Sequence, residues 1–212
     1  MVIRTMRKRV RNANPGKAIK PYHHGDLRAA LIVAAREALE TIAPEDISLK
    51  ALAVQLGVTQ PAPYRHFAGR EALLSAVAID GFQQLCAQLA PQQELSARED
   101  FLGGCDAYMN FARKNRGLYR LMFASRLLKR SEGTELTEVA GTSFTILLDR
   151  VRRCCGIGGA ELNAVWVWST LHGLAMLDAE EITAGPLSSP LTSKQVIRQM
   201  VDSLTHQKGP IA

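Results

Sequence analysis

Apolar residues recur at steps of three and four along most of the chain, which is the spacing of one face of an α-helix. Two stripes near the start cover residues 27–42 and 49–56. Later stripes cover residues 69–91, 101–112, 118–125, 136–151, 161–181 and 193–206. No stretch alternates apolar and polar residues as a half-buried strand does. With a short polar helix at residues 60–67, the pattern predicts an all-α fold of about nine helices.

The second apolar stripe has the start and stop signals of a short helix. Leu49, Leu52 and Leu56 lie on one side of it, so that side is expected to be buried. Ser48 can cap its first turn by accepting a hydrogen bond from a backbone N–H. Gly57 follows the last apolar residue, where a left-handed conformation is expected and only glycine carries no Cβ penalty.

A second short helix is expected at residues 60–67, with Thr59 as its cap. Pro61 and Pro63 fall in its first turn, where the spare N–H groups tolerate proline. Two short helices joined by a glycine turn form a helix-turn-helix, which delivers its second helix to the DNA major groove. The segment therefore predicts a DNA-binding function.

Charge is distributed unevenly along the chain. Residues 1–70 hold 12 Lys or Arg and 5 Asp or Glu, a balance of +7. Residues 71–212 hold 14 and 15, a balance of −1, and the two values sum to the net charge of +6. The positive excess therefore accompanies the helix-turn-helix, as in a module that binds phosphates.

Much of this excess lies in residues 1–21, which contain basic side chains and no acidic one, with Asn14-Pro15-Gly16 breaking any helix. We expect a flexible basic arm. It either lies along a neighbouring DNA groove or serves only as a solubilising tail.

One set of residues in this part of the chain resembles the signature of the TetR family of bacterial transcriptional repressors. The set is Leu52-Ala53, Gly57-Val58-Thr59, Tyr64-Arg65-His66-Phe67 and Arg70-Glu71-Ala72-Leu73-Leu74. Downstream, Trp168-Ser-Thr-Leu-His172-Gly173 is similar to a Trp…His-Gly segment in the ligand-binding domain of one subgroup of that family. The resemblance implies a three-helix DNA-binding domain followed by a helical ligand-binding and dimerisation domain.

The residue types of the second short helix suit DNA. Gln60 can pair bidentately with an adenine, and Ala62 can touch a thymine methyl group. The resemblance implies phosphate contacts for Tyr64, His66 and Arg70, and a groove-facing position for Arg65. The complete set of candidate DNA-binding residues is Ser48, Lys50, Thr59, Gln60, Pro61, Ala62, Tyr64, Arg65, His66 and Arg70.

Other roles for these residues stay open. Tyr64 can instead pack its ring under the helix at residues 27–42, and Arg65 and Arg70 can be plain solvated charges. Pro63 departs from the family pattern, which has an aliphatic residue or threonine there. We expect this change to alter the preferred DNA sequence without abolishing binding.

The remaining helices are expected to surround a mainly apolar pocket for a small molecule. Its candidate lining residues are large, polarizable or hydrogen-bonding, although such residues can equally form a simple core. They are Phe101, Cys105, Tyr108, Tyr119, Met122, Phe123, Phe144, Trp168, His172 and Met176.

The helices at residues 161–181 and 193–206 are the candidates for dimerisation, because the first is apolar nearly all round and needs covering on several sides. The candidate interface residues are Val165, Leu174, Leu177, Ile197, Met200, Val201 and Leu204. The alternative is a monomer that buries both helices internally.

Several function classes lack support in the sequence. The four cysteines have no metal-ligand spacing and are expected to be reduced and mostly buried, so we expect no metal and no cofactor. No nucleophile motif or phosphate-binding glycine loop indicates a catalytic residue. No apolar run suits a membrane span or a signal peptide, so we expect a cytoplasmic protein without a membrane partner.

We expect a basic arm at residues 1–21, a DNA-binding domain at residues 22–70 and an effector-binding and dimerisation domain at residues 71–212. The predicted function is a homodimeric repressor that a small, largely apolar effector releases from a palindromic operator in double-stranded DNA. An activator or an effector-independent regulator of the same fold is the main alternative. A non-specific architectural DNA-binding protein or an enzyme fits the sequence less well.

Overall fold

The structure of the chain is a computed structural model that describes residues 26–91, 94–123, 134–179 and 192–206. These residues form α-helices and two 3-10 helices and contain no strand, which confirms the predicted all-α fold. The elements are α1 (Leu27–Ala38), η1 (Pro44–Asp46), α2 (Leu49–Gln55), η2 (Pro63–Arg65), α3 (Arg70–Gln88), α4 (Ala97–Lys114), α5 (Arg116–Phe123), α7 (Glu135–Cys155), α8 (Ala160–Ala179) and α9 (Ser193–His206).

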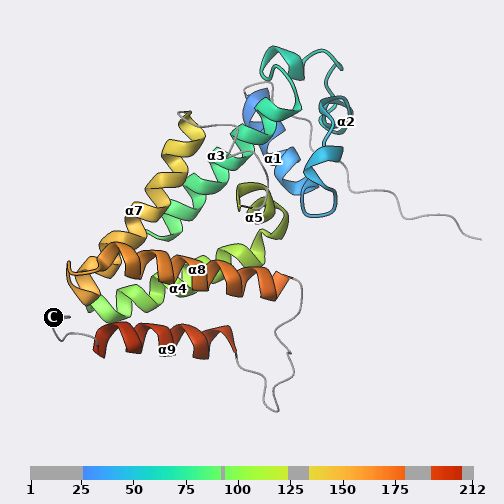
Figure 1. The fold of residues 1–212 in the computed structure, drawn as a ribbon. Helices are drawn as coiled ribbons and strands as arrows, with labels where there is room; N and C mark the ends of the chain where they lie inside the picture. The colour runs from blue at the N-terminus through green and yellow to red at the C-terminus, as the bar shows by residue number, and fades with distance from the viewer. Residues whose placement is uncertain (1–25, 92–93, 124–133, 180–191, 207–212) are drawn as a thin grey trace, which may run out of the picture.

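The elements α1, α2 and η2 gather at one end of the molecule, where they pack against each other and against the start of α3 (Figure 1). Asp26 caps α1 by accepting a hydrogen bond from the Ala29 N–H at 2.9 Å. Ser48 caps α2 in the predicted way, accepting from the Ala51 N–H at 3.4 Å. Gly57 has a φ of 69°, so the chain turns after α2 in the expected left-handed conformation.

The predicted helix at residues 60–67 is wrong in its extent. Only Pro63–Arg65 form a helix, of the 3-10 type, and the residues before it form turns. Pro63 has no N–H to donate to the Thr59 carbonyl, so this bond of an α-helix is missing. Bonds to the third residue back form instead: the Ala62 N–H donates to Thr59 O at 2.9 Å, and the His66 N–H donates to Pro63 O at 3.0 Å.

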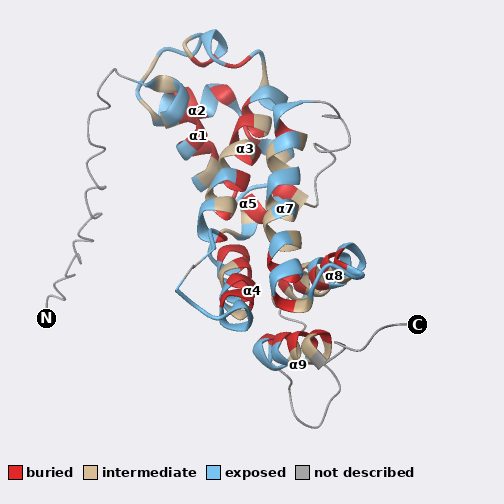
Figure 2. Cartoon of the chain, turned by 90° about the vertical axis from the view of Figure 1, so that its left-hand side faces the viewer, coloured by how far each residue is buried: buried red, intermediate tan, exposed pale blue. Residues whose placement is uncertain are grey.

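The long helix α3 runs from the end formed by α1, α2 and η2 into the rest of the molecule and lies side by side with α7 (Figures 1 and 2). Arg36 of α1 and Asp80 of α3 form an ion pair at 3.2 Å, so α3 is bound to α1 as well as packed on α7. The short helix α5 packs on α3. Gly81 of α3 permits this approach, because a Cβ there would lie 2.8 Å from Met122 Sδ and 2.9 Å from Leu118 Cδ1.

The helices α4, α8 and α9 pack together at the opposite end (Figure 1). The start of α4 is a capping box, in which the Ser96 hydroxyl accepts from the Glu99 N–H and the Glu99 carboxylate accepts from the Ser96 N–H. Buried apolar residues form one continuous core cluster through the described residues (Figure 2). No helix in the described part of the chain is long and apolar enough to cross a bilayer.

The face of α9 predicted for dimerisation is buried within the single chain. Ile197, Met200, Val201 and Leu204 are between 0% and 4% exposed. They pack in the core that α9 shares with α4 and α8. The apolar side of this amphipathic helix is therefore covered inside its own protomer, and the contact of these four residues with a second subunit stays a prediction.

Candidate functional site

The predicted DNA-binding residues lie mostly at the surface around η2. Ser48, Lys50, Thr59, Gln60, Pro61, Tyr64, Arg65, His66 and Arg70 are exposed, and Ala62 is half-buried. Tyr64 is 47% exposed, so much of its ring remains available to a partner. The structure thus brings the ten residues to one end of the molecule.

Buried residues hold η2 in place. Pro63 is buried, and Phe67 is 4% exposed in the core cluster. The Arg28 guanidinium lies 5.5 Å from the centre of the Phe67 ring, so the start of α1 covers this anchor. Arg70, predicted as a phosphate contact, donates to the Glu45 carbonyl and bridges α3 to η1. These contacts therefore fix the position of the turns that precede η2.

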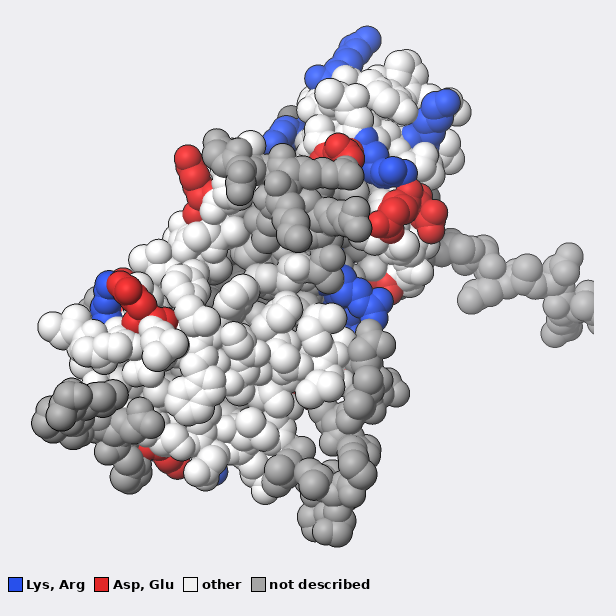
Figure 3. All heavy atoms as spheres, in the orientation of Figure 1, with Lys and Arg blue, Asp and Glu red and all other residues white. Residues whose placement is uncertain are grey.

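The described part of this unit has no excess of charge. Residues 26–70 hold five basic side chains (Arg28, Arg36, Lys50, Arg65 and Arg70) and five acidic ones (Asp26, Glu37, Glu40, Glu45 and Asp46), which gives 5 − 5 = 0. Figure 3 shows basic and acidic side chains close together at the end formed by α1, α2 and η2. The whole balance of +7 up to residue 70 belongs to residues 1–25, which lie outside the described residues.

A largely apolar cavity of about 270 Å³ lies between α3, α4, α5, α7 and α8. Six of the ten predicted lining residues are on its wall: Phe101, Cys105, Tyr108, Phe123, Phe144 and Trp168. Leucines from α3, α7 and α8 complete much of the wall. Burial raises the pKa of the Cys105 thiol to about 12, so this wall residue stays protonated and neutral.

The other four predicted lining residues, Tyr119, Met122, His172 and Met176, are not on the wall. Two of them form a hydrogen-bonded chain behind it: Tyr108 Oη lies 2.8 Å from Tyr119 Oη, which lies 2.7 Å from His172 Nδ1. Burial raises the pKa values of both tyrosines and lowers the pKa of His172, so all three groups are neutral at pH 7. Met122 packs against Gly81 of α3 instead.

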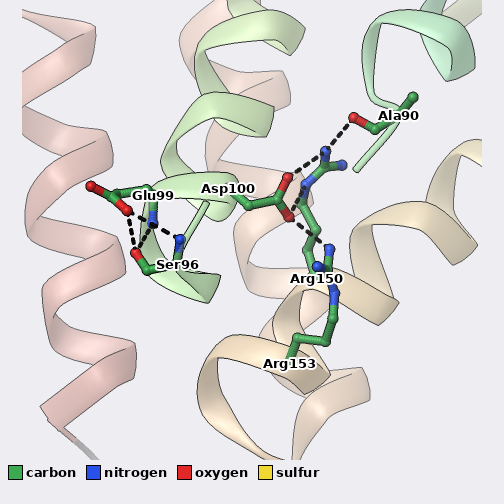
Figure 4. Close-up of polar contacts among 6 residues, drawn as sticks. All are labelled: Ala90, Ser96, Glu99, Asp100, Arg150 and Arg153. Carbon is green, nitrogen blue, oxygen red and sulfur yellow. Dashed lines mark hydrogen bonds and ion pairs between the residues drawn. The ribbon is translucent and has the colours of Figure 1, made fainter. Parts of the chain in front are cut away.

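The most polar part of the cavity wall was not predicted from the sequence. Arg150 of α7 lines the cavity and is only 3% exposed. Its Nε donates to Asp100 Oδ2 at 3.1 Å and its Nη2 to the Ala90 carbonyl at 3.2 Å, while Arg153 Nη2 donates to Asp100 Oδ2 at 2.6 Å (Figure 4). The signal for this cluster was present, since Arg150 stands at helical spacing between Leu147 and Cys154 within an apolar stripe.

The helix α5 connects α1 with the cavity. Phe123, at the end of α5, lines the cavity, and Gly117, near its start, abuts the end of α1. A Cβ at Gly117 would lie 1.9 Å from the Leu39 carbonyl oxygen. The Gly117 N–H also donates to Glu40 Oε1 at 3.2 Å. One short helix therefore lines the cavity and also contacts the end of α1, which packs against η2.

An apolar face of α8 is exposed on the single chain. Leu162 is 75% exposed, Val165 46%, Trp166 41% and Leu177 43%. Val165 and Leu177 were predicted for the dimer interface, and Leu174, also predicted, is half-buried. Trp166 borders a groove whose other wall comes from Gln195, Val196 and Gln199 of α9.

Two family models match the chain, and both describe the same family. The model for bacterial regulatory proteins of the tetR family matches residues 31–77. The model for the tetracyclin repressor-like C-terminal domain matches residues 101–204. The two matches occur in the order of the helix-turn-helix and the cavity-bearing helices. No curated protein matches the chain.

Solved structures share the fold over most of the chain. A protein of unknown function from Rhodococcus sp. RHA1 is 30% identical, with a TM-score of 0.73, covering 89% of this chain and 98% of its own. A regulatory protein of the tetR family from Rhodococcus RHA1 is 16% identical, with a TM-score of 0.62 and coverage of 87% and 98%. A TetR variant from Acinetobacter baumannii AYE in complex with minocycline is 17% identical, with a TM-score of 0.59 and coverage of 86% and 98%.

Proposed function

Since the chain belongs to the TetR family of bacterial DNA-binding transcriptional regulators, we propose that it is a homodimeric repressor that a small, largely apolar molecule releases from a palindromic operator. Family membership also makes it a regulator and not an enzyme. We assign DNA binding to residues 22–70 and effector binding and dimerisation to residues 71–212, with the boundary where α3 begins. The exposed polar residues around η2, mounted on buried Pro63 and Phe67, carry the proposal.

We assign base reading to Gln60, Ala62 and Arg65, and phosphate binding to Tyr64 and His66. Their exposure on a fixed turn supports this assignment, because contacts to phosphates set the register that base contacts need. The 3-10 geometry gives only a short reading surface. Since few bases can be read by one such surface, two copies on a palindrome would supply the specificity.

We assign the dimer interface to the exposed face of α8. Leu162, Val165, Trp166 and Leu177 form a row of large apolar side chains that a second copy would cover. The groove beside Trp166 continues this surface onto α9. A two-fold pairing of the same face suits these residues, because such an interface must be self-complementary.

We propose that release works through α5. A molecule that fills the cavity presses on Phe123, and any shift of α5 reaches α1 at the Gly117–Leu39 contact. Because packed helices move as units, this contact can change the separation of the two reading surfaces. The molecule acts as an effector only if it binds the two separations with different affinity.

Unbiased selection of duplexes bound by the full-length protein tests this function. The expected result is enrichment of one palindrome, a discrete footprint on it and a dimer in solution. Affinity should fall by about 10³–10⁵ between 50 and 200 mM salt if a dimer neutralises 6–10 phosphates. A footprint without sequence preference indicates an architectural protein instead. If the protein binds no duplex at low salt, the proposal is wrong.

Reporter transcription from the selected site then separates repression from activation. A repressor lowers expression from a promoter that overlaps the site, and deletion of the protein restores it. Increased expression from the same arrangement would identify an activator of the same fold.

A further inference from the structure

The guanidinium of Arg150 has one nitrogen whose bonding is incomplete. Its Nε and Nη2 are bound by Asp100 and the Ala90 carbonyl. Its Nη1 is buried, and no described residue accepts a hydrogen bond from it. In Figure 4 this nitrogen is the one without a dashed line. A buried charged donor without an acceptor is costly, so this position favours an acceptor from outside the chain.

The chain leaves room for this guanidinium at the cavity wall. Gly104 lies one turn after Asp100 on α4, and both Gly104 and Arg150 line the cavity. A Cβ at Gly104 would lie 2.8 Å from Arg150 Nε and 3.0 Å from its Cζ. The missing side chain therefore leaves room for the Arg150 guanidinium against α4 at the cavity wall.

The charge around Nη1 favours an anion over a neutral acceptor. Two guanidinium groups, from Arg150 and Arg153, share the single carboxylate of Asp100, which leaves a formal charge of +1. Asp100 is 2% exposed and Arg150 3%, so water screens these two groups weakly, whereas Arg153 is 43% exposed and its charge is partly solvated. A carboxylate would complete the charge balance, whereas an ammonium group would be repelled.

The rest of the wall favours a hydrocarbon body. Phe82, Phe101, Phe144 and several leucines surround the space, and the neighbouring thiol and tyrosines are neutral. We therefore propose that the cavity binds an elongated apolar carboxylate, with one carboxylate oxygen accepting a hydrogen bond from Arg150 Nη1. This inference rests on the proposed function, since it names the chemical class of the effector.

Three unbranched probes of ten carbon atoms test the inference on the full-length protein: decanoate, decanol and decylamine. Calorimetry should give decanoate an affinity at least about tenfold higher than decanol, because a hydrogen bond between charged groups is worth about 1.5–3 kcal/mol. Decylamine should bind more weakly than decanol.

Two neighbouring glycines of α4 supply a matched pair of variants. Gly104→Ala displaces the Arg150 guanidinium, whereas Gly103→Ala places its methyl group in open space. We expect Gly104→Ala to lose most of the preference for decanoate over decanol, and Gly103→Ala to keep it. If Gly104→Ala does not fold, the double variant Asp100→Leu/Arg150→Met replaces the buried pair by apolar side chains. It should lower decanoate affinity at least about tenfold and leave decanol affinity nearly unchanged.

Equal affinity for decanoate and decanol, or a preference that survives Gly104→Ala, overturns the inference. Binding of none of the three probes overturns it as well. These outcomes are distinct from failure of the proposed function, because operator binding is measured without any probe. If decanoate binds through Arg150 but leaves operator affinity unchanged, the assigned ligand class stands and the proposed release mechanism fails.

Discussion

The two ends of the molecule use polar residues in opposite ways. Around η2 the candidate functional side chains are exposed, and separate buried residues, Pro63 and Phe67, support them. Around the cavity the polar groups are themselves buried: Asp100, Arg150 and Tyr108 are at most 6% exposed. If these residues act as proposed, function and stability rest mostly on different residues around η2 and on the same residues at the cavity.

This difference determines whether a mutation can change ligand or DNA recognition without changing stability. A change to an exposed contact residue can abolish recognition in a fully folded protein, since surface substitutions rarely affect stability. A change to a buried ionic group alters the fold and the ligand site together, because it leaves its partner unpaired.

Asp100→Asn should have the largest effect on the free energy of unfolding. A small effect would contradict the view that the polar groups at the cavity are needed for stability. It removes the carboxylate that holds two guanidinium groups and should lower the free energy of unfolding by about 3–5 kcal/mol. Chemical denaturation measures this loss. In the exposed pair of Arg98 and Asp202, Asp202→Asn is the control and should change the free energy of unfolding far less than Asp100→Asn does.

Gln60→Ala should show the reverse behaviour at the DNA-binding end. The free energy of unfolding should stay within about 0.5 kcal/mol of the parent value. Affinity for the selected operator should fall by about 1–3 kcal/mol per subunit, because a bidentate base contact is lost. Gln83→Ala, an exposed glutamine on α3, is the matched control and should leave operator affinity unchanged. If Gln60→Ala also keeps full affinity, Gln60 does not read a base.

Gly117→Ala addresses the contact between the two ends. Its methyl group would meet the Leu39 carbonyl and should lower the free energy of unfolding by about 1–3 kcal/mol through overpacking. The effect of a cavity ligand on operator affinity should also shrink, since α5 can no longer rest against α1. In Gly141→Ala, a methyl group in open space on α7, the free energy of unfolding should stay equal or rise by up to about 1 kcal/mol. Equal behaviour of the two variants would exclude α5 as the connection.

The smallest effect concerns pH. Burial lowers the pKa of His172 below its ordinary value of 6.5, so the unfolded chain takes up a proton there before the folded one does. The free energy of unfolding should therefore fall as the pH drops below about 6.5 toward the lower pKa of the folded state. Its slope should stay below about 1.4 kcal/mol per pH unit, the ceiling for one proton. Denaturation at several pH values, compared with His172→Gln, checks this; an unchanged slope in the variant would assign the dependence to other groups.

The sequence predicted the features that depend on neighbouring residues. The helical stripes, the Ser48 cap and the left-handed Gly57 all follow from local periodicity and backbone sterics. The predicted helix at residues 60–67 was too long. The missing N–H of Pro63 is compatible with the first turn of an α-helix, but it also favours the short 3-10 helix that forms here.

The cavity was harder to predict because its residues meet only in three dimensions. Ala90, Asp100 and Arg150 are separated by up to 60 positions, and nothing local couples them. Aromatic stripes identified six wall residues, but they could not distinguish Phe123, on the wall, from Met122, which faces α3. The sequence could not show what covers the apolar face of α9 for the same reason, because α4 is far from α9 along the chain.

The exposed row of large apolar side chains on α8 has a consequence for how operator occupancy depends on the amount of protein in a cell. If a second subunit covers this row, only paired subunits can occupy an operator with both reading surfaces. At low abundance the number of pairs then falls with the square of the number of subunits, by mass action. A modest change in synthesis would thus switch the controlled gene more sharply than it would with a regulator that acts singly.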